Sequence, residues 1–450
     1  MISRDPVFDK IRTYLFPTLL LLGNLLVVCG TDLAHDEAYY WLFSKNLAWG
    51  YFDHPPMAAW LIALTNWLPG ELGVRLSYVL LMQGSAWLLA SMVPTAQRWF
   101  VWFGINIFPL LAFAGVFAIP DGPLVFMSVL WIWSLERALR ADTISNALLM
   151  GLSTALLFYS KYHGVLFVAA TLLAVPRLFL NRNFWLAAAV GLVLFLPHVH
   201  WQWAHEFATF RYHFVERPSV EAGWRQPTEF LLIQIFLPGL FLAPFVWRAF
   251  FQRNADGEFE RVLKFMTLFV LIFFFISTFN KKLEANWTVA AGLPLLIFVA
   301  RGKLDWFQRR WVKNLAYFSF VTVMAGRLLM IAPPEWHSLK RAHEFHGWPE
   351  WAKDVKVRAG DCRLAANRYQ FASKLSFYLQ EDVPALNVGT RLNQFEFWDW
   401  PEEWPVGDVC WVTERRIFPG EPATTPDGKK LVLVKGFSLS DILKHKDKSL

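Results

Sequence analysis

The stretch LFPTLLLLGNLLVVCGTDLAHDEAYYW (15–41) joins an apolar run directly to an acidic pair, Asp36 and Glu37. A helix needs about 17–25 predominantly apolar residues to cross a bilayer. The run 15–31 follows three basic residues and lacks a small-residue cleavage site, so we predict a retained first transmembrane helix. The acidic segment then begins where the chain leaves the membrane.

The composition of the whole chain supports a membrane protein. Of its 450 residues, 55% are hydrophobic and only 18% are charged, below the roughly 25% of soluble domains. The net charge of +7 comes from short basic clusters between apolar runs, which excludes a nucleic-acid-binding face. Three cysteines are too few for a disulfide-dense scaffold or a zinc finger.

Ten further apolar runs predict a polytopic helical bundle of about 11 spans, within a range of ten to thirteen. The expected spans lie at 15–31, 75–94, 100–118, 122–136, 145–159, 162–176, 184–199, 229–247, 265–279, 286–300 and 315–332. The stretch 57–68 is too short for a confident crossing. If the N-terminus is cytoplasmic, most Lys and Arg fall in cytoplasmic connections, as the positive-inside rule requires.

Two domains follow from this threading: a transmembrane domain at 1–334 and a soluble extracytoplasmic α/β domain at 335–450. We expect helices at 348–357 and 369–379 and strands at 384–388, 408–413 and 430–434. Because both lie in a domain facing an oxidising compartment, we hypothesise that Cys362 and Cys410 pair. In the outer loop 32–73, the segment 36–47 predicts an interfacial helix, and Pro55–Pro56 predicts an extended turn.

Ionisable residues gather on the predicted outer side of the bundle: Asp36, Glu37, Asp53, His54, Asp121, Lys161, His163, Lys281 and Lys282. Charges at membrane depth are costly, so such a gathering indicates function. Carboxylates and amines together suit a reaction in which a hydroxyl loses its proton while a phosphate departs. A sugar linked through phosphate to a lipid is such a donor, because its leaving group needs cations more than a proton-donating acid.

Several motifs resemble those of GT-C-type glycosyltransferases, in the RgtA/B/C/D-like and ArnT-like branch related to the protein O-mannosyltransferases. They are HDEAYYW (35–41), GYFDHPPM (50–57), IPDGPLVF (119–126), YSKYHGVLF (159–167), PHVHWQWAHEFATFRYHF (197–214) and KLEANWTVAAGLP (282–294). GWPEWAKDV (347–355) and the stretch 369–398 resemble the soluble domain of that branch. The resemblance implies a GT-C fold and transfer with inversion from a polyprenyl-phosphate sugar donor. It also implies a bacterial inner-membrane enzyme with its active site facing the periplasm.

The resemblance also implies roles for individual residues. Asp36 would be the general base, Glu37 would orient it or bind a metal, and Asp121 would be the second outer carboxylate. Residues expected to neutralise the donor phosphate are Lys161, Lys281, Lys282 and Arg211, with His54 as a weaker candidate. Residues expected to bind substrate are Tyr39, Tyr40, Asp53, His54, His163 and Asn286. No cofactor is certain, and a divalent cation stays open because no fixed ligand spacing is present.

Less specific interpretations compete with these roles. Asp36 or Glu37 could cap the interfacial helix, and Asp121 could cap the fourth span. The lysines could be boundary residues whose stems lie along lipid. The whole protein could instead be a transporter or flippase of lipid-linked sugars, a protein O-glycosyltransferase or an inactive scaffold. The expected acceptor is an envelope glycolipid or glycan of lipopolysaccharide core or lipid A type, and the sugar itself stays open.

Overall fold

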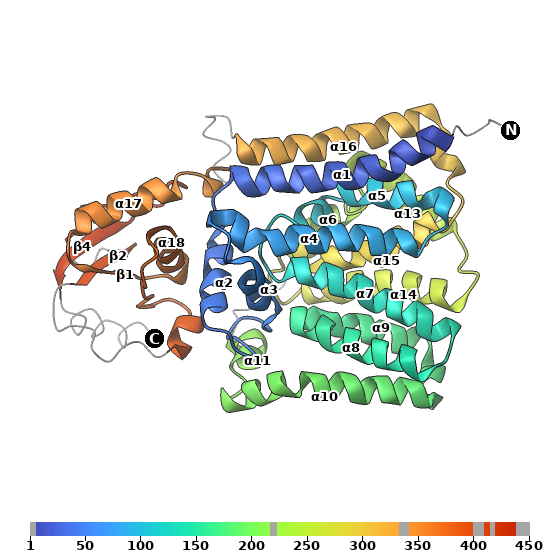
Figure 1. The fold of residues 1–450 in the computed structure, drawn as a ribbon, viewed down its shortest axis with the longest axis horizontal. Helices are drawn as coiled ribbons and strands as arrows, with labels where there is room; N and C mark the ends of the chain where they lie inside the picture. The colour runs from blue at the N-terminus through green and yellow to red at the C-terminus, as the bar shows by residue number, and fades with distance from the viewer. Residues whose placement is uncertain (1–5, 217–222, 333–341, 399–408, 415–418, 438–450) are drawn as a thin grey trace.

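Helix α1 (Pro6–Gly30) contains the apolar run that predicted the first span. In the computed structural model, which describes residues 6–216, 223–332, 342–398, 409–414 and 419–437, α1 lies along one side of a helical bundle. Figure 1 shows the bundle helices running roughly parallel, with a small α/β unit at one end. We call the end that carries this unit the domain end, and the opposite one the far end.

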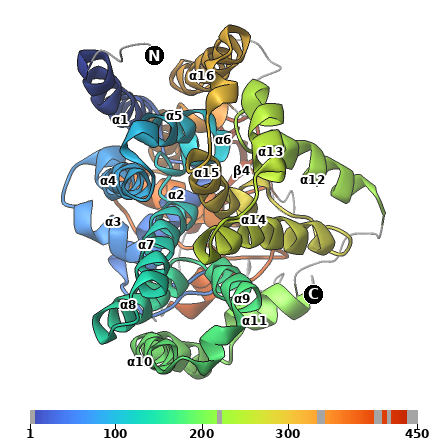
Figure 2. The same cartoon turned by 90° about the vertical axis from the view of Figure 1, so that its right-hand side faces the viewer.

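Every predicted span has a helical counterpart. After α1 these are α4 (Gly70–Ser91), α5 (Arg98–Ile107) with α6 (Pro109–Ala114), α7 (Asp121–Arg140), α8 (Ile144–Ser160), α9 (Val165–Ala174), α10 (Arg182–Ala204), α12 (Arg225–Ile235) with α13 (Ala243–Gln252), α14 (Glu258–Ser277), α15 (Gly292–Ala300) and α16 (Arg310–Ile331). Short 3-10 helices flank them: η1 (Thr95–Gln97), η2 (Tyr162–Gly164), η3 (Pro176–Leu180), η5 (Leu240–Leu242), η6 (Ala285–Ala291) and η7 (Asp305–Gln308). Figure 2 shows the bundle end-on, with α15 and α6 near its centre.

Breaks in the helices explain why few of them are long. Among the described residues, three helices are long and apolar enough to cross a membrane, or up to five if each sharply bent pair is one span. Pro109 lacks an amide hydrogen and separates α5 from α6. Gly239, at a φ of 97°, turns the chain between α12 and η5, where it bends by 90°.

Ion pairs tie the helices together at the far end. Glu136, near the end of α7, pairs with Arg140 and Arg301. Arg253 pairs with Glu260 across the connection from α13 to α14 at 2.5 Å. Arg140, Arg253 and Arg301, which the sequence places in cytoplasmic connections, therefore lie at the far end.

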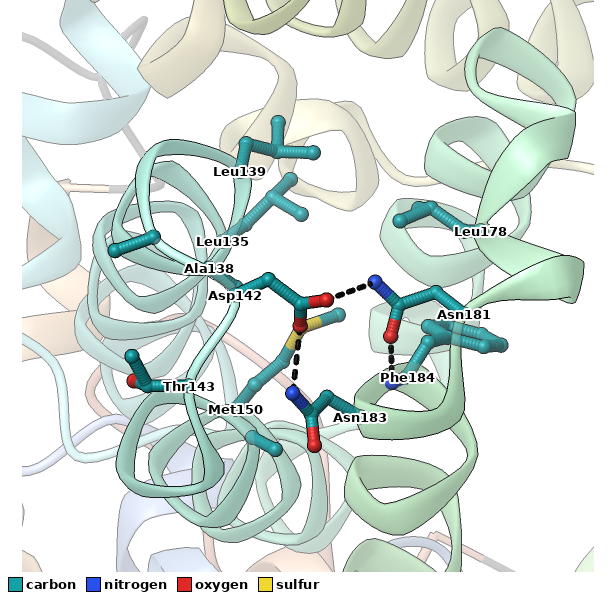
Figure 3. A pocket seen from close by; sticks show the side chains of 12 residues that line it. Leu135, Ala138, Leu139, Asp142, Thr143, Met150, Leu178, Asn181, Asn183 and Phe184 are labelled. Carbon is teal, nitrogen blue, oxygen red and sulfur yellow. Dashed lines mark hydrogen bonds between the residues drawn. The ribbon is translucent and has the colours of Figure 1, made fainter.

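A crevice at this end is lined by Asp142, which accepts hydrogen bonds from Asn181 and Asn183 at 2.9 and 2.7 Å (Figure 3).

The loop between α1 and α4 lies across the domain end. Helix α2 (His35–Lys45) corresponds to the predicted interfacial helix, and the chain bends by 88° between α1 and α2. Helix α3 (Met57–Thr65) follows the predicted Pro55–Pro56 turn. Further along the chain, α11 (Ala208–Arg211) and a π-helical turn, η4 (Tyr212–Glu216), also lie at this end.

The α/β unit packs on α2 through α18 (Tyr369–Leu379). Its other elements are η9 (Ala342–Phe345), α17 (Trp348–Ala359), η10 (Gln394–Phe397), β1 (Arg363–Ala366), β2 (Val409–Thr413), β3 (Glu421–Pro422) and β4 (Val432–Phe437). The sheet order is β1-β2-β4-β3, with β1 parallel to β2 and both other pairings antiparallel. In the register, Ala366 lies opposite Val412, and Val412 opposite Leu433.

Two sequence predictions for this unit have definite outcomes. The strand expected at 384–388 is wrong, because that segment makes a single bridge, Ala366 to Ala385, and β1 takes the place beside β2 instead. β1 was missed because RLAA is short and lacks β-branched residues. The pairing of Cys362 with Cys410 is confirmed, with a disulfide joining β2 to the chain just before β1.

Candidate active site

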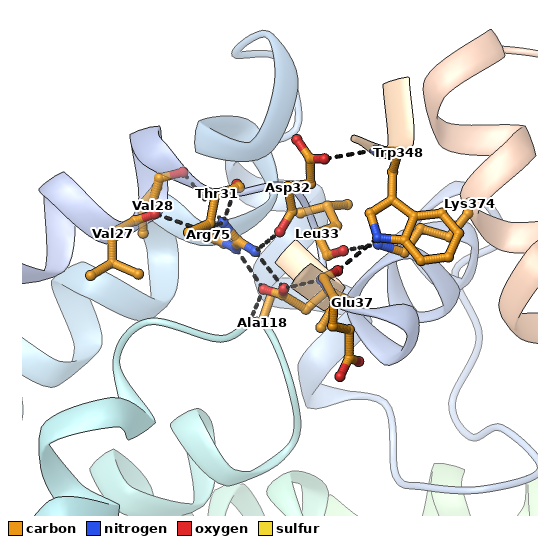
Figure 4. Close-up of polar contacts among 12 residues, drawn as sticks. Val27, Val28, Thr31, Asp32, Leu33, Glu37, Arg75, Ala118, Trp348 and Lys374 are labelled. Atoms are coloured by element: carbon orange, nitrogen blue, oxygen red, sulfur yellow. Dashed lines mark hydrogen bonds and ion pairs between the residues drawn. The ribbon is translucent and has the colours of Figure 1, made fainter. Parts of the chain in front are cut away.

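Glu37 and Arg75 form a buried ion pair at the junction of α1, α2 and α4 (Figure 4). Both side chains are 0% exposed, and the shorter nitrogen–oxygen distance is 2.6 Å. Each carboxylate oxygen of Glu37 accepts two hydrogen bonds: one from Arg75, and one from the backbone amide of Ala34 or Ala118. All four strong acceptor positions of this carboxylate are therefore occupied by the protein itself.

Arg75 uses its remaining donors to hold the turn after α1. Its Nη atoms donate to the carbonyl oxygens of Val28, Thr31 and Asp32 and to the Thr31 hydroxyl. The pair thus fixes the end of α1, the start of α2 and the segment that leads into α7. The interpretation of Glu37 as a helix cap is confirmed. Metal binding by Glu37 stays a prediction, and a cation there would have to replace one of these four hydrogen bonds.

Asp36, the neighbour of Glu37, points the other way. Its side chain is solvent-exposed, and its Oδ1 accepts a hydrogen bond of 3.2 Å from the Tyr369 hydroxyl of α18. Its other oxygen accepts no hydrogen bond from any residue in the described ranges. Although solvent reaches Asp36, surrounding protein removes much of its hydration. This burial, followed by the negative charge of Asp53, raises its pKa to about 6.

Asp53 lies beside Asp36, and two side chains donate hydrogen bonds to its carboxylate. The Tyr39 hydroxyl donates to Oδ2 at 2.9 Å, and Arg391 donates to Oδ1 at 2.9 Å. The Tyr39 hydroxyl in turn accepts a hydrogen bond of 2.6 Å from the amide of Gln394. Phe52, the residue before Asp53, donates its amide to the Gln394 side chain at 2.7 Å. The α/β unit is therefore joined to the outer loop by a continuous polar network.

Asp121 and Lys161 form a second buried pair at the same end of the bundle. Asp121 is 4% and Lys161 5% exposed, and Lys161 Nζ lies 2.9 and 3.1 Å from the two carboxylate oxygens. The Asn286 amide donates to Asp121 Oδ2 at 2.9 Å. Asp121 is the first residue of α7 but makes no side-chain capping bond, so its interpretation as a cap is wrong. The adjacent Gly122 allows close packing, because a Cβ there would lie 2.5 Å from the Tyr78 ring.

Tyr40 and His54 are neighbours, with ring centroids 5.9 Å apart. Burial raises the pKa of Tyr40 well above its usual value, and the charges of Asp36, Asp53 and Asp121 raise it further. Burial and the nearby positive charge of Lys161 hold the pKa of His54 well below its usual range. His54 is therefore neutral at pH 7 in the substrate-free protein, and its expected role toward the donor phosphate stays a prediction.

The other predicted phosphate and substrate residues are His163, Lys281, Lys282 and Arg211. His163 packs its ring against Phe274 and Trp287 at centroid distances of 5.0 Å. Lys281 is half-buried and Lys282 exposed, both just after the end of α14. Arg211 is exposed and pairs with Glu206 at 3.3 Å. In the described part of the chain, no three His, Cys, Asp or Glu side chains converge to hold a metal ion.

Three residues of the site were missed by sequence reasoning. Arg75 carried a usable signal, because a charge inside an apolar helix indicates a buried partner. Tyr369 and Arg391 carried none, because they lie more than 300 residues from Asp36 and Asp53 along the chain.

The chain is similar in sequence to known membrane glycosyltransferases. The family model of dolichyl-phosphate-mannose-protein mannosyltransferases matches residues 53–201. The chain is 30% identical over 324 residues to the lipid A galacturonosyltransferase RgtD of Rhizobium johnstonii, covering 67% of this chain and 66% of that protein. It is 27% identical to the lipopolysaccharide core galacturonosyltransferase RgtA of the same organism, covering 45% of this chain and 43% of that protein. The matched stretches thus span about two thirds and less than half of these relatives.

Two solved structures share the fold over almost the whole chain. ArnT from Cupriavidus metallidurans superposes with a TM-score of 0.67 in the apo state, at 13% identity, covering 93% of this chain and 97% of that one. The same protein bound to undecaprenyl phosphate gives a TM-score of 0.66 at 14% identity, with the same coverage. The chain therefore belongs to the GT-C-type membrane glycosyltransferases of the RgtD, ArnT and PMT type.

Proposed function

We propose that this protein is an inverting glycosyltransferase that moves one sugar from a polyprenyl-phosphate donor to a hydroxyl of a lipid A or lipopolysaccharide core acceptor. The observation that supports the proposal is the presence of two different kinds of charged group at the domain end. An exposed carboxylate, Asp36, lies near but apart from a compensated pair, Asp121 and Lys161. One group is suited to take a proton, and the other to stabilise charge on a leaving group.

In the proposed reaction, the acceptor hydroxyl gives its proton to Asp36 as its oxygen forms a bond to the anomeric carbon of the sugar. The bond from that carbon to the phosphate oxygen breaks on the opposite face, which inverts the configuration. The phosphate departs with the bonding electrons, and its charge is met by Lys161 with the Asn286 amide, and by Lys281, Lys282 and Arg211 at the periphery. A base with a pKa near 6 is ionised at pH 7 while still accepting a proton readily.

The relatives support a uronic acid as the sugar. Both curated relatives are galacturonosyltransferases, one acting on lipid A and the other on lipopolysaccharide core. The solved relative is bound to undecaprenyl phosphate, which supports a polyprenyl-phosphate donor. We therefore propose a donor in which the uronic acid is linked to polyprenyl phosphate.

We further propose that the domain end faces the periplasm of a bacterial inner membrane. The Cys362–Cys410 disulfide supports this orientation, because disulfides persist in oxidising compartments. The basic residues at the far end support it as well, because cytoplasmic connections carry the excess of Lys and Arg.

The test is transfer by the purified full-length protein in detergent micelles. The substrates are polyprenyl-phosphate galacturonic acid and lipid A, and the product is measured by mass spectrometry. We expect Asp36→Asn to lower the rate by about 10²–10⁴-fold. Asp382→Asn, an exposed carboxylate on the α/β unit, is the matched control and should leave the rate unchanged.

Two results would contradict the proposal. Full transfer by the Asp36→Asn protein would remove Asp36 as the base. No transfer by the wild-type protein in micelles, together with movement of the lipid-linked sugar across sealed vesicles, would support a flippase instead, because transport needs a closed bilayer and transfer does not.

A further inference from the structure

The α/β unit supplies two of the groups that contact the acidic residues of the proposed site. The Tyr369 hydroxyl donates to Asp36, and the Arg391 guanidinium donates to Asp53. The hydrogen bonds of the Lys161–Asp121 pair involve Asn286 and neither of these two residues. We therefore treat the role of Tyr369 and Arg391 apart from binding of the donor phosphate.

Arg391 is held in a fixed position. Its guanidinium lies over the rings of Tyr212 and Tyr369, 5.2 and 5.1 Å from their centroids, while Nη1 is 2.9 Å from Asp53. Two aromatic faces and a carboxylate fix both the plane and the direction of the guanidinium group. Its side chain is 38% exposed, so the charge is only partly screened by water.

We infer that Arg391 and Tyr369 are positioning residues that hold Asp53 and Asp36 and thereby set the pH range in which Asp36 acts as the base. This inference rests on the proposed function and extends the site into the α/β unit. Asp53 places a second negative charge near Asp36, and Arg391 compensates that charge. Tyr369 favours the ionised form of Asp36 by donating a hydrogen bond to it.

The charged and titratable groups around Asp36 come from every element that packs against it. They are His35, Glu37 and Tyr40 of α2, Asp53 and His54 of the outer loop, Tyr369 of α18, Arg391 of the following segment and Glu344 of η9. Of these, Glu37 is compensated by Arg75, and His54 is neutral. Asp53 and Glu344 disfavour the ionised form, whereas Tyr369 and Arg391 favour it.

The experiment is the pH dependence of kcat/KM for four variants of the full-length protein and one control variant. Arg391→Gln removes a positive charge and should move the acid limb of the profile to higher pH. The rate at a fixed acidic pH should then fall about tenfold for every pH unit by which the limb moves. At high pH its rate should approach that of the wild type. Asp53→Asn should move the limb to lower pH, and the double variant should lie between the two single variants.

Tyr369→Phe removes one hydrogen bond while keeping the ring beneath Arg391, and it should move the limb upward by a smaller amount. Arg358→Gln is the control, since Arg358 pairs with Asp354 on the surface of the same unit at 2.8 Å, and it should not move the limb. A second readout needs no turnover: carbodiimide couples to protonated carboxyl groups, so labelling of Asp36, read by peptide mass spectrometry, should change with pH in the same order.

Loss of transfer by Arg391→Gln at every pH, with the labelling of Asp36 unchanged, would overturn the inference. Movement of the acid limb in the same direction by Arg391→Gln and Asp53→Asn would also overturn it. Failure of the proposed function is a different result, in which the wild-type protein makes no product while the pH dependence of Asp36 labelling still differs among the variants.

Discussion

The Arg75 guanidinium and the Glu37 carboxylate meet through two hydrogen bonds, of 2.7 and 2.6 Å, at a point where neither side chain is exposed to solvent. This contact sets the position of the next carboxylate along the chain. Because Glu37 is turned inward and fixed, Asp36 at the start of α2 is turned toward solvent and toward Tyr369. The adjacent acidic residues therefore differ in their surroundings: Glu37 is buried and holds the structure, and Asp36 is exposed to solvent.

Glu37→Gln should destabilise the protein strongly. The substitution removes the negative charge and leaves Arg75 buried without compensation, which typically costs about 3–5 kcal/mol. The measurement is the free energy of unfolding in mixed detergent–SDS micelles. Glu229→Gln is the control, since Glu229 pairs with Arg225 on the surface and its loss should cost less than about 1 kcal/mol. Equal losses for the two variants would contradict a structural role for the Glu37–Arg75 pair.

Asp36→Asn should stabilise the protein at neutral pH while it lowers the rate of transfer. The pKa of Asp36 rises from 3.8 to about 6 on folding, so the folded state favours the protonated form. The stability contributed by this group is complete below pH 3.8 and is lost as the pH rises through about 6. An uncharged asparagine avoids that loss. Thermal unfolding of both proteins at pH 4 and pH 7.5 checks this, and a variant that unfolds earlier than the wild type at pH 7.5 would contradict it.

Variants of the Asp121–Lys161 pair should show that the pair contributes to the rate of transfer as well as to stability. Lys161→Met leaves Asp121 buried without its cation and should lower both the unfolding free energy, by about 3–5 kcal/mol, and the rate of transfer. The double variant Lys161→Met with Asp121→Leu replaces the pair by apolar groups and should recover most of the stability. Transfer should stay lost in the double variant. Recovery of transfer together with stability would show that the pair is structural only.

Thiol labelling can test the pairing of Cys362 with Cys410 without an activity assay. Thiol labelling of the unreduced protein should modify Cys29, which is free and exposed, and should leave Cys362 and Cys410 unmodified. Replacing both paired cysteines by serine should cost about 2–4 kcal/mol in the stability of the α/β unit. Mass spectrometry of labelled peptides and limited proteolysis provide the two measurements. Labelling of all three cysteines in natively isolated protein would contradict the pairing.

Much of the architecture followed from local sequence patterns. Apolar runs place each bundle helix, because the length of a run and its neighbouring basic residues are properties of adjacent residues. Two helices of the α/β unit were also predictable, since their periodicity is local. β1 was not, because a short strand is stabilised by pairing with β2, 46 residues further along, rather than by its own sequence.

The sequence by itself determined the membrane class of this protein, the order of its helices and the presence of Asp36 after the first span. Only the tertiary structure decided that Glu37 is locked to Arg75, 38 residues away, and that Tyr369 and Arg391 reach Asp36 and Asp53 across separations of 333 and 338 residues. The physical reason is that helix formation depends on neighbouring residues, whereas the pairing and pKa of a charge depend on whichever side chains the whole fold brings within a few ångströms.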